Sequence, residues 1–271
     1  MLFLQCLIWS HVRRVDRAGT ELLQTCGKYI GEAATRIQQD KSSRDGERVG
    51  RSVLEKLLER CGDKTEIPTV MAMDAMLAGV DTTGASATFL LYLLAVNQDK
   101  QELLYREIQE VMGEGEVTVA GLKRMKYLRA CSQESHRLLP VINGASRRTQ
   151  KDLVLSNYRV PTGTCVIYWT FMCARSECQY EQPQRFLPER WLRGHEDYQQ
   201  AHAFSHIPFG HGPRSCIGRR FAEMEVSVLV IKILQHFRLE YEGPPLGLIM
   251  SFTNKPDRPV NIKFRDRHSS V

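Results

Sequence analysis

One long apolar run restricts what this chain can fold into more than any other feature of the sequence. Residues 69–96 have the sequence TVMAMDAMLAGVDTTGASATFLLYLLAV, in which Asp74 and Asp81 are the only charged side chains, and Pro68 precedes them. The run is long enough to cross a bilayer, but two carboxylates inside it favour a helix through a large soluble core. We therefore predict a long core helix that opens at Pro68.

Other segments add helices and a small β part. Apolar residues recur at helical spacing, and charged or glycine-rich stretches separate the segments. Residues 152–169 alternate β-branched residues around Asn157 and a Pro-Thr-Gly turn, which predicts a hairpin, and residues 260–264 predict a short strand. The fold class is therefore mainly α with a small β part. The predicted helices lie at 21–38, 52–61, 100–113, 126–140 and 219–237, with an exposed loop at 39–50.

Charge and cysteine content narrow the classes of function. The 271 residues carry a formal net charge of +6, but Lys and Arg are spread along the chain, so we expect no nucleic-acid partner. The eight cysteines include no C-x-x-C pair, which favours a reduced, intracellular environment over a disulfide framework. The initial stretch MLFLQCLIW is too short for a membrane anchor and is followed by no signal-peptide cleavage site.

Residues 209–220, FGHGPRSCIGRR, place one cysteine among glycines and arginines. Cys216 lies just before a predicted helix, where unpaired N–H groups and the helix dipole favour negative charge. Gly210, Gly212 and Gly218 let the backbone turn tightly and let a flat group approach. Such a thiolate is a soft axial ligand for haem iron, whereas an isolated cysteine is more often an ordinary buried side chain.

The spacing of this loop resembles the haem-binding loop of the cytochrome P450 family. The pattern F-x-x-G-x-R-x-C-x-G is met by Phe209, Gly212, Arg214, Cys216 and Gly218. The resemblance implies haem b with the Cys216 thiolate as iron ligand, Arg214 on a haem propionate and Phe209 beside the sulfur. It also implies close approach of the haem to the glycines of the loop, Gly210 and Gly218 among them.

A second pair of motifs is similar to the same family. Glu134 and Arg137 are spaced i, i+3 on one predicted helix, which on its own is typical of an exposed ion pair of little energetic value. In the family, such an E-x-x-R pair joins the Arg of a later P-E-R segment, here Arg190, in a buried network that supports the haem loop. The order in this chain matches that of the family.

The third motif, AGVDTTG at 78–84, lies inside the long apolar run. Thr82 can hydrogen-bond to its own backbone, so we expect the helix to open locally there, although small residues can also serve packing alone. The family's A/G-G-x-D/E-T pattern crosses the distal face of the haem. By that resemblance Gly79 makes room for dioxygen, and Asp81 with Thr82 relays protons to it.

Further arginines suggest a haem contact and an electron donor. SRRT at 146–149 resembles a family segment that sends an Arg to a propionate, and Arg148 is the better candidate than Arg147, with a solvated basic pair as the alternative. GRRFAE at 218–223 resembles the mitochondrial branch, whose electrons come from an acidic ferredoxin. Its candidate contacts are Arg219, Arg220 and Arg129, although Arg219 or Arg220 could simply extend from a buried helix.

The resemblance thus implies a haem-dependent monooxygenase that inserts one oxygen atom of O2 into an apolar, steroid-like substrate, with xenobiotic oxidation as the alternative. It implies a mitochondrial, inner-membrane-associated protein with peripheral membrane contact, the endoplasmic reticulum being the alternative. Residues 1–271 correspond to one partial domain, the C-terminal portion of the family fold. A truncated, non-catalytic form that binds a partner or sequesters ferredoxin is a second hypothesis.

A zinc protein is a third hypothesis. It rests on the closely spaced His202, His206 and His211, which no H-E-x-x-H motif or cysteine pair accompanies.

Overall fold

The computed structural model describes residues 20–37, 52–62, 66–251 and 253–267. The predicted loop at 39–50 lies outside these residues. Contacts divide the chain into two compact units, Met1–Val80 and Asp81–Val271, and the boundary falls inside the long helix α3, Glu66–Val96. The chain is mainly helical with short paired strands, as the sequence predicts.

The first unit contains a helix over residues 20–37, the helix α2, Val53–Cys61, and the beginning of α3. Ser52 caps α2, because its hydroxyl accepts from the Glu55 amide at 3.2 Å while the Glu55 carboxylate accepts from the Ser52 amide at 2.9 Å. Ile30, Ala33 and Leu58 form a small core between the helices. The sequence therefore specifies both the start of α2 and its buried face.

Helix α3 begins two residues before Pro68 and is α-helical without interruption from Glu66 to Val96. The expected opening at Thr82 is therefore wrong. We attribute the unbroken helix to the tightly packed turns that follow, where Phe89 and Leu94 are fully buried and fix the backbone. Of the described helices, α3 alone is long and apolar enough to cross a bilayer, and half of its most apolar window is buried inside the protein.

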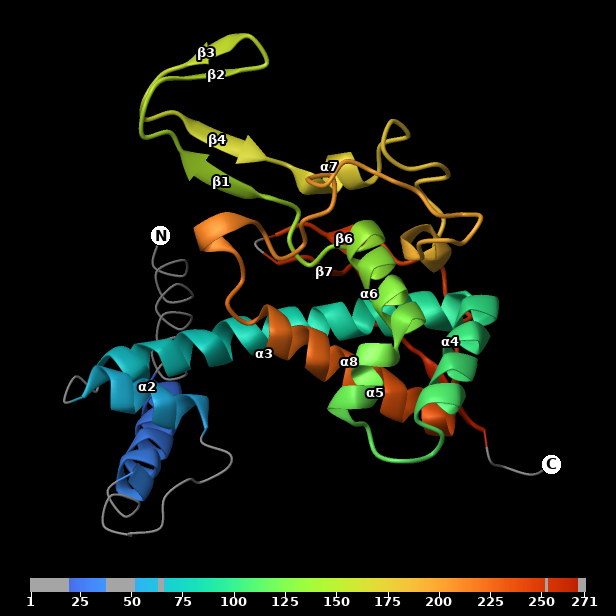
Figure 1. The fold of residues 1–271 in the computed structure, drawn as a ribbon, viewed down its shortest axis with the longest axis horizontal. Helices are drawn as coiled ribbons and strands as arrows, with labels where there is room; N and C mark the ends of the chain where they lie inside the picture. Colours follow the sequence, from blue (N-terminus) through green and yellow to red (C-terminus); the bar gives the residue numbers. More distant parts are fainter. Residues whose placement is uncertain (1–19, 38–51, 63–65, 252, 268–271) are drawn as a thin grey trace, which may run out of the picture. The chain divides into compact units, whose positions relative to one another are not determined.

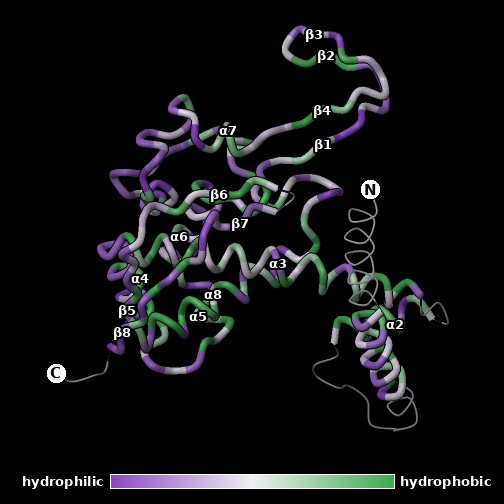
Figure 2. Tube along the Cα trace, turned by 180° about the vertical axis from the view of Figure 1, so that it is seen from behind, coloured by the Kyte–Doolittle hydropathy of each residue, from purple (hydrophilic) through white to green (hydrophobic). Residues whose placement is uncertain are grey.

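The second unit packs the C-terminal half of α3 against helices α4, α6 and α8 (Figure 1). Leu104 of α4, Leu128 of α6 and Val230 of α8 are almost completely buried in one hydrophobic core. Hydrophobic colour runs along α8 in Figure 2, consistent with its part in that core. The bounds are Gln98–Val111 for α4, Val119–Arg124 for α5, Lys126–Leu138 for α6, Thr170–Ala174 for α7 and Arg219–His236 for α8, with 3-10 turns at Pro188–Trp191 and Gly212–Arg214.

The strands form antiparallel pairs. The predicted hairpin at Asn157 is confirmed, because Ser156 and Asn157 have φ of 48° and 68°, the left-handed pair that a type I′ turn needs. The segment after the Pro-Thr-Gly turn pairs instead with an earlier strand, which places Arg148 opposite Cys165. The pairs are β1 Ala145–Arg148 with β4 Cys165–Tyr168, β2 Leu153–Leu155 with β3 Tyr158–Val160, β5 Phe237–Glu240 with β8 Lys263–Asp266, and β6 Leu248–Ile249 with β7 Lys255–Pro256.

Candidate functional site

The cysteine loop is a tight turn that ends at the start of α8. Gly210 and Gly212 have φ of 71° and 73°, a left-handed conformation that glycine adopts without strain. The Cys216 amide donates to the Phe209 carbonyl at 2.8 Å, which closes the loop over the short turn between them. Gly218 directly precedes α8, so Cys216 lies three residues from the helix start, as the sequence predicts.

The thiol of Cys216 is free and exposed, and its surroundings suit a flat apolar group that carries carboxylates. Ile217 is 91% exposed and Phe221 is 54% exposed, an arrangement that leaves apolar surface beside the sulfur without protein cover. A Cβ added at Gly218 would lie 3.9 Å from the sulfur, within van der Waals contact. Arg214 is exposed and has no hydrogen-bond or ion-pair partner among the residues that the structure describes, so its guanidinium is available to a carboxylate. The residues present therefore fit haem.

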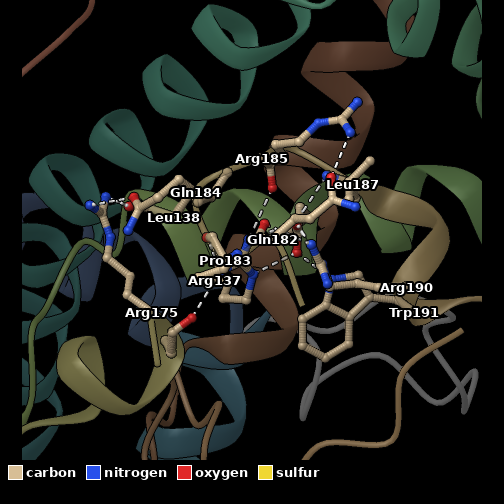
Figure 3. A network of polar contacts seen from close by, with 12 residues as sticks. Arg137, Leu138, Arg175, Gln182, Pro183, Gln184, Arg185, Leu187, Arg190 and Trp191 are labelled. Carbon is tan, nitrogen blue, oxygen red and sulfur yellow. Dashed lines mark hydrogen bonds and ion pairs between the residues drawn. The ribbon is translucent and has the colours of Figure 1, made fainter. Parts of the chain in front are cut away.

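Glu134, Arg137 and Arg190 meet in one buried cluster, and each is at most 1% exposed. Both nitrogens on one side of Arg137 bind the Glu134 carboxylate, at 2.8 and 2.9 Å, and Arg190 Nε donates to it at 2.9 Å. The Trp191 indole and the Leu187 amide donate to the same carboxylate, each at 2.9 Å. Figure 3 shows Arg137, Arg190 and Trp191 directed toward this point.

The remaining donors of the two arginines hold the chain between α7 and the P-E-R turn. Arg137 donates to the carbonyls of Ala174 at 2.8 Å and Pro183 at 2.6 Å, and Arg190 donates to the carbonyl of Glu181 at 3.1 Å. Both guanidiniums lie over the ring of Tyr180. Because burial raises the pKa of Tyr180, its hydroxyl stays neutral beside the network. The cluster fixes the segment that leads toward the cysteine loop.

Sequence reasoning missed several members of this region. The Trp191 indole was detectable in principle, because a buried Trp N–H needs an acceptor and the residue adjoins Arg190. The role of Glu189 was harder to detect. Its carboxylate accepts from Lys100 at 2.9 Å and from the Tyr127 hydroxyl at 2.8 Å, and Lys100 lies 89 residues earlier in the sequence. No local pattern indicates a contact over that separation.

Of the motif in α3, Asp81 and Thr82 belong to the second unit, whereas Gly79 belongs to the first. Asp81 Oδ2 accepts from the Thr253 hydroxyl at 3.1 Å and lies 3.3 Å from Lys255 Nζ. The carboxylate is therefore attached to the segment that leads into β7. A Cβ added at Gly79 would meet no atom within 4 Å, so the backbone there is open to a close neighbour.

The segment that follows α6 and the segment that leads into β7 meet through polar contacts. Asn143 and Asn254 exchange amide hydrogen bonds of 2.9 and 2.7 Å, and Asn254 also donates to the Pro140 carbonyl at 2.7 Å. A hollow of about 580 Å³ lies elsewhere, over the strands β1, β2 and β4, and Arg147 and Arg148 line it but Cys216 does not. Arg148 is exposed and donates to the Gly163 carbonyl at 2.9 Å.

The three candidate partner-binding arginines are all exposed. Arg219 forms an ion pair with Glu223 at 2.8 Å and lies over the Phe209 ring at 5.3 Å. Arg129 donates to the carbonyls of Met125 and Lys123, each at 3.1 Å, so its guanidinium is held at the junction of α5 and α6. Arg220 has no ion pair within the described ranges.

The three histidines of the zinc hypothesis contact aromatic residues, and His202 and His211 share Phe204 as a neighbour. His202 accepts from the Phe204 amide at 3.2 Å, His206 packs on Trp191 and His211 packs edge-on against Phe204. No group of three potential metal ligands occurs among the described side chains. The geometry therefore gives zinc no support.

Comparisons with known proteins agree over nearly the whole chain. The family model for Cytochrome P450 matches residues 2–261. The chain is 37% identical to Cytochrome P450 CYP12A2 of Musca domestica, in an alignment that covers 96% of this chain and 51% of that protein. It is 39% identical to Probable cytochrome P450 12a5, mitochondrial, of Drosophila melanogaster, over 88% of this chain and 46% of that protein. The chain spans about half the length of the curated relatives it matches.

Proposed function

Since this chain belongs to the cytochrome P450 family, we propose that it is the part of a haem-thiolate monooxygenase that carries the iron-ligating cysteine. The proposed reaction inserts one oxygen atom of O2 into an apolar, steroid-like substrate and reduces the other to water. The observation that carries the proposal is the exposed, free Cys216 thiol in its glycine-turned loop. Members of the family hold haem b through such a cysteine, and bound haem supplies the oxygen activation.

The roles of the surrounding residues follow from their chemistry. Arg214, which has no partner among the described residues, offers a guanidinium suited to a propionate, and Arg148 is the second candidate for that contact. Phe209 is the proposed apolar neighbour of the sulfur, and its carbonyl accepts from the Cys216 amide. In proton delivery, Asp81 holds a proton-accepting carboxylate one residue from the Thr82 hydroxyl, and its bonds to Thr253 and Lys255 orient it. Gly79 keeps the helix surface free of bulk.

The proposed electron donor is a ferredoxin. The proposed location is the inner membrane of the mitochondrion. Several relatives carry the word mitochondrial in their names, among them proteins of Drosophila melanogaster and Drosophila acanthoptera. Arg220, Arg219 and Arg129 supply positive charge for an acidic protein, although Arg219 is partly neutralised by Glu223. Such a contact gives an association rate that falls with added salt.

The two units are proposed to form one partial domain, because the family match runs through both. A second candidate function is binding of ferredoxin without catalysis. It is favoured by the exposed arginines beside the cysteine loop. Haem uptake by the chain distinguishes the two.

The deciding experiment is the carbon-monoxide difference spectrum of the reduced chain, produced with added haem. We expect the strongly red-shifted Soret band of a thiolate complex, and Cys216→Ser should abolish it. Cys165→Ser is the matched control, since Cys165 is also an exposed, free cysteine and its loss should leave the band intact. A band that survives Cys216→Ser would overturn the ligand assignment, and iron-free protein would favour the non-catalytic candidate.

A further inference from the structure

A group of four side chains connects α3 to the cysteine loop, and none of its contacts is used in the function proposed above. Ser86 Oγ lies 2.8 Å from His136 Nε2. The His136 ring packs edge-on against the Phe209 ring, with centroids 5.5 Å apart, and the Arg219 guanidinium lies 5.3 Å from the same ring. All four residues belong to the second unit.

The hydrogen bond is made to a neutral imidazole. Burial and the nearby Arg219 charge lower the pKa of His136 to about 4, so at physiological pH the ring has one donor and one acceptor nitrogen. A hydroxyl both donates and accepts, so Ser86 bonds to Nε2 in either tautomer of the ring.

The path continues from the Phe209 ring to the cysteine. The Phe209 carbonyl accepts from the Cys216 amide at 2.8 Å, so the residue whose ring His136 contacts also closes the loop through its backbone. Arg219, the first residue of α8, contacts the same Phe209 ring and is itself held by Glu223 at 2.8 Å. Every step from α3 to the Cys216 amide is therefore a direct contact.

Ser86 occupies a distinctive place on α3. It lies four residues after Thr82, which puts both side chains on the same face of the helix, one turn apart. Ser86 is 8% exposed, so it reaches α6 without competition from bulk water. A shift of this turn of α3 would move the hydroxyl that orients the His136 ring.

We propose that His136 is a positioning residue that fixes the Phe209 ring, and through it the Cys216 loop, to the turn of α3 that follows Thr82. The inference rests on the proposed function only in naming Cys216 as the iron ligand; the coupling itself is a property of the haem-free chain. It ties the loop that would hold the proximal ligand to the helix that carries Asp81 and Thr82.

The test is hydrogen exchange of the 271-residue chain without haem, followed by mass spectrometry of peptides that contain Cys216. Ser86→Ala removes one oxygen and leaves the ring, and His136→Gln removes the ring. We expect exchange at the Cys216 amide to be about fivefold to tenfold faster in each variant than in the unmodified chain. This is the change that follows from losing an edge-on aromatic contact of ordinary strength. The double variant should add little beyond either single one, because both break the same path.

Thr88→Ala is the matched control. Thr88 lies on the same helix, but its hydroxyl bonds to the Gly84 carbonyl of that helix at 2.8 Å, so the exchange of the loop should not change. Unchanged exchange at Cys216 in Ser86→Ala would overturn the proposal, as would equal acceleration in the β5 and β8 peptides, which would indicate only a general loss of stability. Since no haem is present, failure here is separate from failure of the carbon-monoxide test.

Discussion

At the scale of single residues, the arginines of the second unit divide by their partners. Arg137 and Arg190 are buried and fully engaged by one carboxylate and several carbonyls. Arg214 is exposed, with no acidic partner in the described part of the chain. A buried guanidinium must be paired because desolvation costs several kcal/mol, whereas an exposed, unpaired one is free to bind a ligand. The buried arginines therefore support the fold, whereas the exposed Arg214 is available to bind a ligand.

Thr82 is the residue whose proposed role differs most from a packing role. In a catalytically competent form of the protein, Thr82→Ala should retain haem and substrate binding but divert reducing equivalents to peroxide or water, because the hydroxyl that passes a proton is lost. The measurement is product formed per reduced cofactor consumed. Thr88→Ala removes a hydroxyl two turns along the helix and should keep that ratio. Tightly coupled turnover in Thr82→Ala would exclude Thr82 from proton delivery.

At the scale of elements, α6 connects two systems through neighbouring positions. Glu134 and Arg137 point into the buried cluster with the P-E-R turn, while His136 faces α3 and the cysteine loop. Neighbouring residues of one helix can face two different systems because successive side chains are separated by about 100° around the axis. Helix α6 is thus the element on which the segments before and inside the cysteine loop both depend.

Loss of the central carboxylate should destabilise the second unit strongly. Glu134→Gln leaves Arg137 and Arg190 buried without their negative partner, and breaking such a pair costs about 3–5 kcal/mol. The measurement is the urea midpoint of the chain, followed by circular dichroism. Glu242→Gln is the control, because its ion pair with Lys263 is exposed and its loss should leave the midpoint nearly unchanged. Equal midpoints for the two variants would contradict the structural role of the cluster.

At the scale of the whole molecule, stability is expected to depend on pH through two partly buried histidines. Burial is the main cause that lowers the pKa of His136 to about 4 and that of His206 to about 3. Neighbouring positive charge acts in the same direction, from Arg219 on His136 and from His136 on His206. The folded state therefore binds fewer protons than the unfolded state at pH values below about 6.5.

The sign of the effect follows directly. Between about pH 6.5 and pH 4 only the unfolded state takes up these protons, so the free energy of unfolding should fall as the pH is lowered from 7 to 5. The measurement is the urea midpoint at both pH values. The fall should be smaller in His206→Gln, whereas His195→Gln, which alters an exposed histidine, should retain it. A midpoint that rises on acidification would contradict the burial of these rings.

The sequence by itself determined the elements whose signals are local. The capped start of α2, the extent of α6 and α8 and the turn at Asn157 follow from capping residues, helical spacing and a left-handed pair. The spacing around Cys216 also identified the loop, because its glycines and arginine act within ten residues of the sulfur.

Only the tertiary structure decided which distant side chains meet. The unbroken course of α3 depends on how its later turns pack in the core. Three further features join segments far apart in sequence: the pairing of β4 with β1, the bond between Lys100 and Glu189, and the contact of Ser86 with His136. Packing selects these contacts because a buried donor or acceptor must find a partner wherever the fold brings one. Local patterns carry no information about that choice, since it is made by the assembled core.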